Sequence, residues 1–334
     1  MTSTYSVVRD GVAFINFKDE GRFEISGSDA TAFMNGLVSK DLEALEELRT
    51  VQTLFLNDAG EVISIAWVMV DRDRLVILTE PADRDLLRDH LQAKLAEAGG
   101  LDVTVSDLGE TMQSLALMGP SAQKLATDAV HEDIIGLSFL SFDQYDEIDA
   151  LVMRVGYVGE YEYRILVPQG DETVEKKIRE AGAEIGLEEI DPAGLAPLML
   201  EMRQITRSRD LNGVSPIEAG LHEMIDFKKE EFIGRDAVLA MKDNIERRLM
   251  TVVIPGPKIA AFDPEVRIDD DVVGRVVSHD YSEGMESMLV HCVVNSDVAA
   301  VGVTYDLYDG SGALVAGTAQ SAPLLLTKTI KGVT

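Results

Sequence analysis

Cysteine, basic residues and long apolar runs are scarce in this chain of 334 residues, and each scarcity excludes a class of protein. The single cysteine, Cys292, rules out an internal disulfide and any zinc or iron–sulfur site that needs several thiolates. No apolar run approaches the roughly 20 residues that a membrane-spanning helix requires, so we expect no membrane partner. The first residues lack a basic segment followed by an apolar one, so no signal peptide is expected. Together these features predict a cytoplasmic protein.

Positive charge is in short supply. Lysine and arginine number 30 against 59 aspartates and glutamates, and the formal net charge is −29. Because the chain has no basic tract, we expect no nucleic acid partner. The acidic residues are dispersed along the chain, and dispersed acidity keeps a protein soluble at high ionic strength. Two interpretations stay open, a salt-adapted host and an ordinary acidic enzyme.

The histidines and glycines do not form the spacings of metal or nucleotide sites. The five histidines lack the H-x-x-x-H spacing of a metal site, and no G-x-G-x-x-G follows a predicted strand. His291 precedes Cys292 in an apolar strand, but neighbours on a strand point to opposite faces. We therefore predict that Cys292 is a small buried hydrophobic residue and not half of a Cys–His dyad.

Hydrophobic periodicity predicts an α+β protein. We expect strands within residues 5–27, a helix capped by Ser28, a hairpin turn at residues 57–60, and helices over residues 81–98 and 172–183. After Arg248 the helical patterns end, and short strands alternate with turns rich in Gly, Asp and Ser. We predict two mixed α/β subdomains over residues 1–245 and a small C-terminal β-barrel over residues 246–330.

Residues 156–163, GYVGEYEY, form a candidate binding loop directly after a predicted strand. Two glycines flank an aromatic residue, and an acid and two further aromatics follow. Such a loop lets the backbone approach a ligand and offers ring faces and a carboxylate to a flat heteroaromatic molecule. The alternative is a tyrosine-rich hairpin that packs on its neighbour.

Residues 215–238, SPIEAGLHEMIDFKKEEFIGRDAV, are the most distinctive stretch. Pro216 favours a turn, and Gly234 permits a tight one before a helix that begins near Arg235. The stretch resembles the P-x-E-A-G-L…F-K…F-I-G-R segment of the folate-dependent aminomethyltransferase family, typified by the T-protein of glycine cleavage. Weaker matches to that family lie in register at residues 23–34, 57–60, 118–122, 156–160, 198–201 and 274–282.

The resemblance implies a three-part cloverleaf around a central hole that holds tetrahydrofolate. It also implies a transferase that acts on a small methylated or aminomethyl donor. Residues 228–235 carry no cysteine, which disfavours the branch of the family that serves iron–sulfur assembly. On this alignment we expect seven residues to bind the cofactor: Tyr157, Glu160, Tyr163, Arg164, Glu201, Arg203 and Tyr281.

The chain also departs from the family at the positions that carry its chemistry. The family's aspartate pair falls on Ser64 and Ile65, and Ile65 cannot exchange a proton. An asparagine of the family falls on Thr79, and the arginine of L-R-x-E falls on Met199. The glutamate that pairs with the pterin ring falls on Arg164, which reverses both charge and donor sense, so the same contact cannot persist.

These exchanges favour a demethylase-like transfer of a methyl group to tetrahydrofolate, which depends mainly on positioning. They leave the catalytic residues unassigned. The first alternative is a non-catalytic folate- or small-ligand-binding protein of the same fold. The second is an aminomethyltransferase of glycine cleavage that works with a lipoylated carrier protein and uses another acid in place of the lost aspartate.

Overall fold

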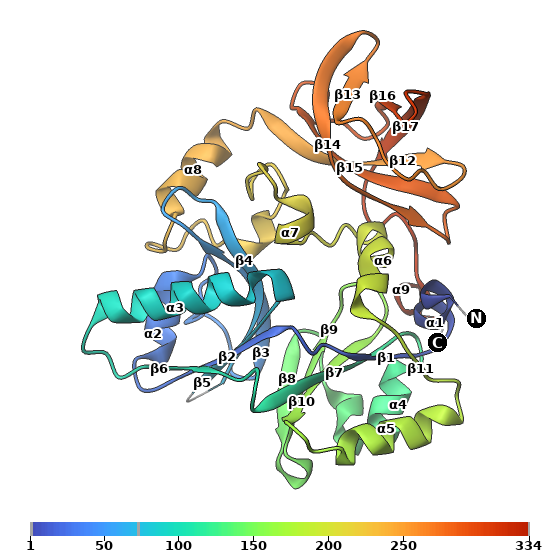
Figure 1. Cartoon of the computed structure of the whole chain (residues 1–334). Helices are drawn as coiled ribbons and strands as arrows, with labels where there is room; N and C mark the ends of the chain where they lie inside the picture. The colour runs from blue at the N-terminus through green and yellow to red at the C-terminus, as the bar shows by residue number, and fades with distance from the viewer. Residues whose placement is uncertain (1–2, 72–73, 333–334) are drawn as a thin grey trace.

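The computed structural model describes residues 3–71 and 74–332, and over these residues the strands form one open sheet and one closed barrel (Figure 1). The sheet has eleven strands in the order β11-β1-β7-β10-β9-β8-β3-β4-β5-β2-β6 within those described ranges. Their bounds are β1 (Ala13–Asn16), β2 (Gly21–Ser26), β3 (Arg49–Leu56), β4 (Val62–Val70), β5 (Arg74–Thr79), β6 (Thr104–Asp107), β7 (Met112–Met118), β8 (Ser141–Tyr145), β9 (Ala150–Val155), β10 (Glu162–Pro168) and β11 (Glu188–Glu189).

Helices cover both halves of this sheet. Their bounds are α1 (Thr4–Asp10), α2 (Ala30–Leu37), α3 (Arg84–Ala98), α4 (Ala122–Ala129), α5 (Thr173–Ala183), α6 (Ala196–Glu201), α7 (Arg207–Asp210), α8 (Arg235–Asp243) and α9 (Lys328–Lys331). Helices α2 and α3 bury Met34, Leu87 and Leu91 against β2–β5, whereas α4 and α5 bury Leu125 and Ile178 against the other half. Among the described residues, no helix is long and apolar enough to cross a membrane.

The barrel closes in the order β12-β15-β14-β13-β16-β17. Its strands are β12 (Arg247–Pro255), β13 (Glu265–Ile268), β14 (Asp271–Ser282), β15 (Ser287–Asn295), β16 (Thr304–Tyr308) and β17 (Leu314–Gln320). Cys292 lies in the barrel core, and its neighbour His291 faces out toward α7, so the predicted opposition of the two side chains is confirmed. The predicted α+β fold with a terminal barrel is likewise confirmed.

Residues 215–238 connect the sheet to the barrel. Ile217, Phe232 and Val238 share a core with Leu54 of β3 and with Val293 of the barrel. The turn before α8 requires glycine, because Gly234 has a φ of 82° and an added Cβ would lie 2.5 Å from the Asn57 carbonyl oxygen. The tight turn predicted at this glycine is therefore confirmed.

A buried lysine fixes the same stretch to the end of α2. The ammonium group of Lys229 donates hydrogen bonds to the carbonyl oxygens of Val38 and Lys40, both at 2.7 Å, and to that of Asn35. A cation suits the C-terminal end of a helix, where carbonyl groups lack partners. Burial lowers the pKa of Lys229 to about 8, so the lysine is still largely protonated at neutral pH.

Two local predictions were wrong. Residues 4–10 form α1 and not a strand, because Ser3 caps the segment by accepting a hydrogen bond from the backbone N–H of Ser6. Ser28 does not cap α2; Asp29 occupies that position, and Ser28 donates instead to Asp102. The hairpin turn at residues 57–60 is confirmed, since β3 and β4 pair antiparallel on either side of it.

Candidate functional site

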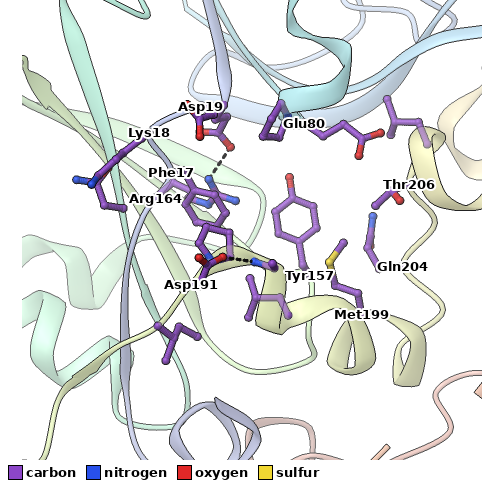
Figure 2. Close-up of a pocket in the computed structure, with 18 of the residues that line it drawn as sticks. Phe17, Lys18, Asp19, Glu80, Tyr157, Arg164, Asp191, Met199, Gln204 and Thr206 are labelled. Atoms are coloured by element: carbon purple, nitrogen blue, oxygen red, sulfur yellow. Dashed lines mark hydrogen bonds and ion pairs between the residues drawn. The ribbon is translucent and has the colours of Figure 1, made fainter. Parts of the chain in front are cut away.

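A cavity of about 690 Å³ lies where the β1–β2 connection, the β3–β4 hairpin and η1 (Pro81–Asp83) meet the segment from Glu189 to Thr206. Figure 2 shows the Tyr157 ring projecting into the middle of this cavity, with Met199 and Gln204 on one side and Arg164 and Phe17 on the other. A volume of this size accommodates a cofactor-sized molecule.

Negative charge predominates in the lining of the cavity. Two cationic side chains, Lys18 and Arg164, line it together with five carboxylates: Asp19, Glu20, Glu80, Glu189 and Asp191. The remaining polar side-chain groups are the amides of Asn16, Gln52 and Gln204 and the hydroxyls of Tyr157 and Thr206. The cavity is therefore rich in hydrogen-bond acceptors and attracts positive charge.

Arg164 lies at the floor of the cavity between two carboxylates. Its Nη1 donates to Oε1 of Glu20 at 2.6 Å, and its Nε donates to Oε1 of Glu162 at 2.8 Å. The second oxygen of Glu20 accepts from the Ser114 hydroxyl at 2.7 Å, and that of Glu162 accepts from the Tyr157 N–H at 3.0 Å. We call Glu20, Arg164 and Glu162 the buried charge triad.

Aromatic rings enclose the guanidinium group of this triad. The guanidinium carbon of Arg164 lies 3.5 Å from the ring centroid of Phe17 and 5.4 Å from that of Tyr157. Burial alone would lower the pKa of Arg164, but the carboxylates of Glu20 and Glu162 raise it above its ordinary value. Arg164 is therefore permanently charged, and it already forms ion pairs with the carboxylates of Glu20 and Glu162.

The positions that depart from the family come together here. Ile65, Arg164 and Met199 all line the cavity, and the hydroxyl groups of Thr79 and Ser64 contact each other just behind Ile65. The wall around Ile65 thus presents hydrocarbon and hydroxyl groups, which do not titrate near neutral pH. The exchanges therefore alter one site and are not scattered over the molecule.

Two carboxylates, Glu80 and Asp83, lie beside this wall, just after the end of β5. Glu80 lines the cavity and accepts hydrogen bonds from the backbone N–H and the hydroxyl of Ser208, at 3.0 Å and 2.8 Å. Asp83 is fully buried; one oxygen pairs with Arg207, and the other has no hydrogen-bond partner among the described residues. Burial and the charge of Glu80 raise the pKa of Asp83 from 3.8 to about 6, against the pull of Arg207.

Replacing Asp83 with asparagine should flatten the pH dependence of stability. Asp83 binds its proton more tightly in the folded state than in the unfolded state, which stabilises the fold by about 2 to 3 kcal/mol. This contribution is complete below pH 3.8 and is lost as the pH rises through about 6. Urea unfolding at a series of pH values measures this slope. The exposed Asp85→Asn variant is the control, and equal slopes in parent and Asp83→Asn would contradict the raised pKa.

Helix α7 connects the cavity wall to the barrel. Asp210 accepts hydrogen bonds from the Thr206 N–H at 2.9 Å, the Ser278 hydroxyl at 2.6 Å and Arg209 at 2.8 Å, and its carboxylate lies 3.0 Å from Nδ1 of His291. Burial would raise the pKa of Asp210, but the hydrogen bonds from His291 and Arg209 hold it well below its usual range. Figure 1 shows α6 and α7, in yellow, between the sheet and the barrel.

Comparison with known proteins identifies the scaffold. A family model described as the GCVT N-terminal domain matches residues 2–229. The chain belongs to this family. Its relatives include an aminomethyltransferase of Caldanaerobacter subterraneus subsp. tengcongensis, 28% identical over 309 residues, which are 90% of this chain and 81% of the relative. The aminomethyltransferase of Alkaliphilus oremlandii is 26% identical over 325 residues, or 92% and 84% of the two chains.

A solved structure shows the same fold over nearly the whole chain. The crystal structure of glycine cleavage system aminomethyltransferase T from Bartonella henselae matches with a TM-score of 0.84 and 18% identity, covering 97% of this chain and 89% of that one. The GCVT family and its fold are thus confirmed for this chain. The predictions that follow directly from the family, a transferase and the cofactor tetrahydrofolate, are also confirmed.

The structure brings only some of the seven residues expected to bind the cofactor into the cavity of this GCVT-family chain. Tyr157 and Arg164 line it. Tyr163 is buried in the core beneath α4 and α5, because successive residues of β10 point to opposite faces of the sheet. Arg203 donates to the carbonyl oxygens of Ala219 and Leu249, outside the cavity lining.

The other three lie at the junction between the termini and the barrel. Glu160 accepts hydrogen bonds from the backbone N–H groups of Lys328 and Thr329 at the start of α9. Glu201 pairs with Arg9 of α1 at 2.6 Å and accepts from the Ser282 hydroxyl. Tyr281 packs against the barrel core. None of the three belongs to the lining of the cavity.

Sequence reasoning missed the residues of the β1–β2 connection. Phe17, Lys18, Asp19 and Glu20 all line the cavity, and the buried Arg22 shapes this loop by donating to the carbonyl oxygens of Phe17 and Lys18. A charged run between two short apolar strands was the available signal. In the described part of the chain, no three His, Cys, Asp or Glu side chains converge in a way that could hold a metal ion.

Proposed function

We propose that the cavity binds tetrahydrofolate and that the chain transfers a methyl group to it from a small methylated donor. The observation that carries this proposal is the gathering of Tyr157, Ile65, Arg164 and Met199 around one cavity of about 690 Å³. Its size suits a folate, and its carboxylate and amide acceptors suit the N–H donors of a pterin ring. When bound, tetrahydrofolate supplies the nitrogen that accepts the one-carbon group.

The wall at Ile65 favours methyl transfer over a reaction that needs a proton donor at that point. In methyl transfer the bond between the methyl carbon and its donor breaks, and the electron pair stays on the donor. The carbon bonds to a nitrogen of tetrahydrofolate, whose proton is released to solvent. The protein's task is to align the two reactants, and alignment alone contributes a large part of the rate enhancement. Hydrocarbon from Ile65 and Met199 also excludes water from the reacting groups.

A second candidate is the aminomethyltransferase reaction with a lipoylated carrier protein. Relatives of this chain bear the name aminomethyltransferase. Asp83, with a pKa raised to about 6, lies directly behind the wall where the family's aspartate is missing, and a carboxyl group of that pKa is suited to proton transfer near neutral pH. Asp83 is fully buried and does not line the cavity, so it would replace the lost aspartate only by acting through an intervening group.

Titration followed by product analysis separates these candidates. Calorimetry with tetrahydrofolate first tests binding, and we expect a dissociation constant well below 1 mM, within the range of cofactor sites. The bound protein is then given either small methylated amines and sulfonium compounds or an aminomethyl-loaded lipoylated carrier. Mass spectrometry distinguishes methyl- from methylenetetrahydrofolate.

Each outcome supports or removes one candidate. Methyltetrahydrofolate would support the proposal. Methylenetetrahydrofolate, formed only with the carrier and lost in Asp83→Asn, would support the second candidate. Binding of tetrahydrofolate without either product would indicate a binding protein that retains the fold. Absence of binding would overturn both enzymatic candidates.

A further inference from the structure

Trp67 of β4 carries a buried hydrogen-bond donor that no acceptor satisfies. Its side chain is 6% exposed, and its indole Nε1 has no hydrogen-bond partner among the described residues. An indole N–H only donates, so it needs an acceptor. A buried donor without an acceptor destabilises the native state, and folded proteins contain few of them. The indole nitrogen therefore calls for an explanation beyond packing.

The side chain of Trp67 lies on the face of β4 that borders the cavity. Residues two apart on a strand point to the same face, and Ile65, two residues earlier, lines the cavity. Gln52 of β3 is the cross-strand partner of Trp67, and it also lines the cavity. The indole ring meets the Tyr157 ring edge-on, with 5.9 Å between the ring centroids. Trp67 thus lies at the edge of the cavity, directly behind the ring of Tyr157.

The hydroxyl group of Tyr157 does not make up for the missing acceptor. Burial raises the pKa of Tyr157, against the opposing effects of Arg164 and Trp67, so the hydroxyl keeps its proton. Figure 2 shows this hydroxyl inside the cavity, without a hydrogen bond to the other residues drawn. If the indole N–H turns onto the Tyr157 oxygen, the Tyr157 proton still needs an acceptor. The two side chains therefore present a surplus donor in either arrangement.

An uncharged acceptor on a ligand suits this surplus donor. Five carboxylates and two cationic side chains line the cavity, so an anionic acceptor such as a carboxylate or phosphate is repelled. Carbonyl oxygens and the ring nitrogens of heterocycles accept hydrogen bonds without carrying charge. The ring of Tyr157 also offers a face on which a flat heterocycle packs.

We propose that Trp67 and Tyr157 form a donor subsite, which binds an uncharged acceptor atom, a carbonyl oxygen or ring nitrogen, on a flat heterocyclic ligand. The assignment of that heterocycle to the pterin ring of tetrahydrofolate rests on the proposed function. A ligand edge that presents an N–H or C–H group at this place leaves the donor unpaired and binds more weakly. The donor subsite therefore selects which edge of the ligand lies against β4.

The test compares two uncharged bicyclic probes of similar size, each titrated into the full chain by ligand-observed NMR. The ring nitrogens of quinoxaline only accept hydrogen bonds, whereas the N–H of indole only donates. We expect quinoxaline to bind about fivefold more tightly than indole. Trp67→Phe should remove this preference by weakening quinoxaline, whereas a general loss of packing would weaken both probes alike.

A second measurement needs no variant and covers the case that Trp67→Phe folds poorly. Trp67 is the single tryptophan of the chain, so the ¹⁵N-labelled protein has one indole N–H resonance. Quinoxaline should shift the proton of that resonance downfield, as formation of a hydrogen bond does, and indole should not.

Tyr163→Phe is the matched control for the loss of an unpaired buried donor. The Tyr163 hydroxyl also has no partner among the described residues, but it lies in the core beneath α4 and α5. Its removal should leave the preference for quinoxaline unchanged. Equal binding of the two probes, a preference that survives in Trp67→Phe, or an indole resonance that quinoxaline does not shift downfield would overturn the donor subsite. If quinoxaline is preferred but tetrahydrofolate does not bind, the donor subsite stands and the proposed function is rejected.

Discussion

Replacing Arg164 with methionine is expected to lower the free energy of unfolding by about 4 kcal/mol, the cost of leaving buried carboxylates without their cation. Both Glu20 and Glu162 would keep their buried positions and lose the guanidinium group that bonds to them. Methionine matches much of the volume of arginine, so packing against Phe17 should change little. Urea denaturation at neutral pH measures the loss.

Arg179 offers a matched control for this substitution. It also pairs with two carboxylates, Glu175 and Glu189, and lies over a phenylalanine ring, but its side chain is 42% exposed. Arg179→Met should therefore cost less than about 1 kcal/mol. Combining Arg164→Met with Glu20→Gln and Glu162→Gln should recover most of the lost stability, because no unpaired charge remains. Equal losses for Arg164→Met and Arg179→Met would refute the account of the triad.

The second large effect is expected at Asp210. Its replacement by alanine should cost about 3 to 4 kcal/mol, because it removes a buried charge from the hydrogen-bond network that joins Thr206, Ser278, Arg209 and His291. Chemical denaturation again gives the magnitude. Calorimetry with tetrahydrofolate should also show weaker binding, because the cavity wall at Thr206 loses its anchor.

The exposed Asp236→Ala variant controls for the loss of a carboxylate, since Asp236 is 97% exposed and pairs only at the surface with Arg235. Its effect should stay within about 0.5 kcal/mol. The network at Asp210 would lose its assigned role if the two alanine variants were equally stable. If stability falls but tetrahydrofolate affinity is unchanged, Asp210 anchors the barrel and does not position the cavity wall.

The fold was predictable because its signals are local. Turn residues at 57–60 and 234 and the change from helical to strand patterns near residue 248 each act within a few positions. The cavity was less predictable. Tyr163 lies between Glu162 and Arg164 in the sequence, but strand alternation places it on the opposite face. The alternation of side chains along β10 is enough, from the sequence alone, to place Tyr163 on the face opposite to Glu162 and Arg164.

The residues that bond to Glu201, Glu160 and Glu20 could not be predicted from the neighbouring sequence. Glu201 pairs with Arg9, which lies 192 residues earlier in the chain. Glu160 accepts a hydrogen bond from the backbone N–H of Lys328, which lies 168 residues later. The family resemblance suggested ligand contacts for both residues, and in the structure both also bond to residues near the ends of the chain. Glu20 reaches Arg164 over 144 residues, so the compensation between them could be recognised only in three dimensions.

The position of Asp210 links the barrel to the cavity thermodynamically. The barrel contributes no residue to the lining of the cavity, yet its Ser278 and His291 share one carboxylate with the cavity wall at Thr206. Any ligand that binds the native wall therefore also raises the free energy needed to detach the barrel. We therefore expect ligand affinity and docking of the barrel to change together in variants of Asp210.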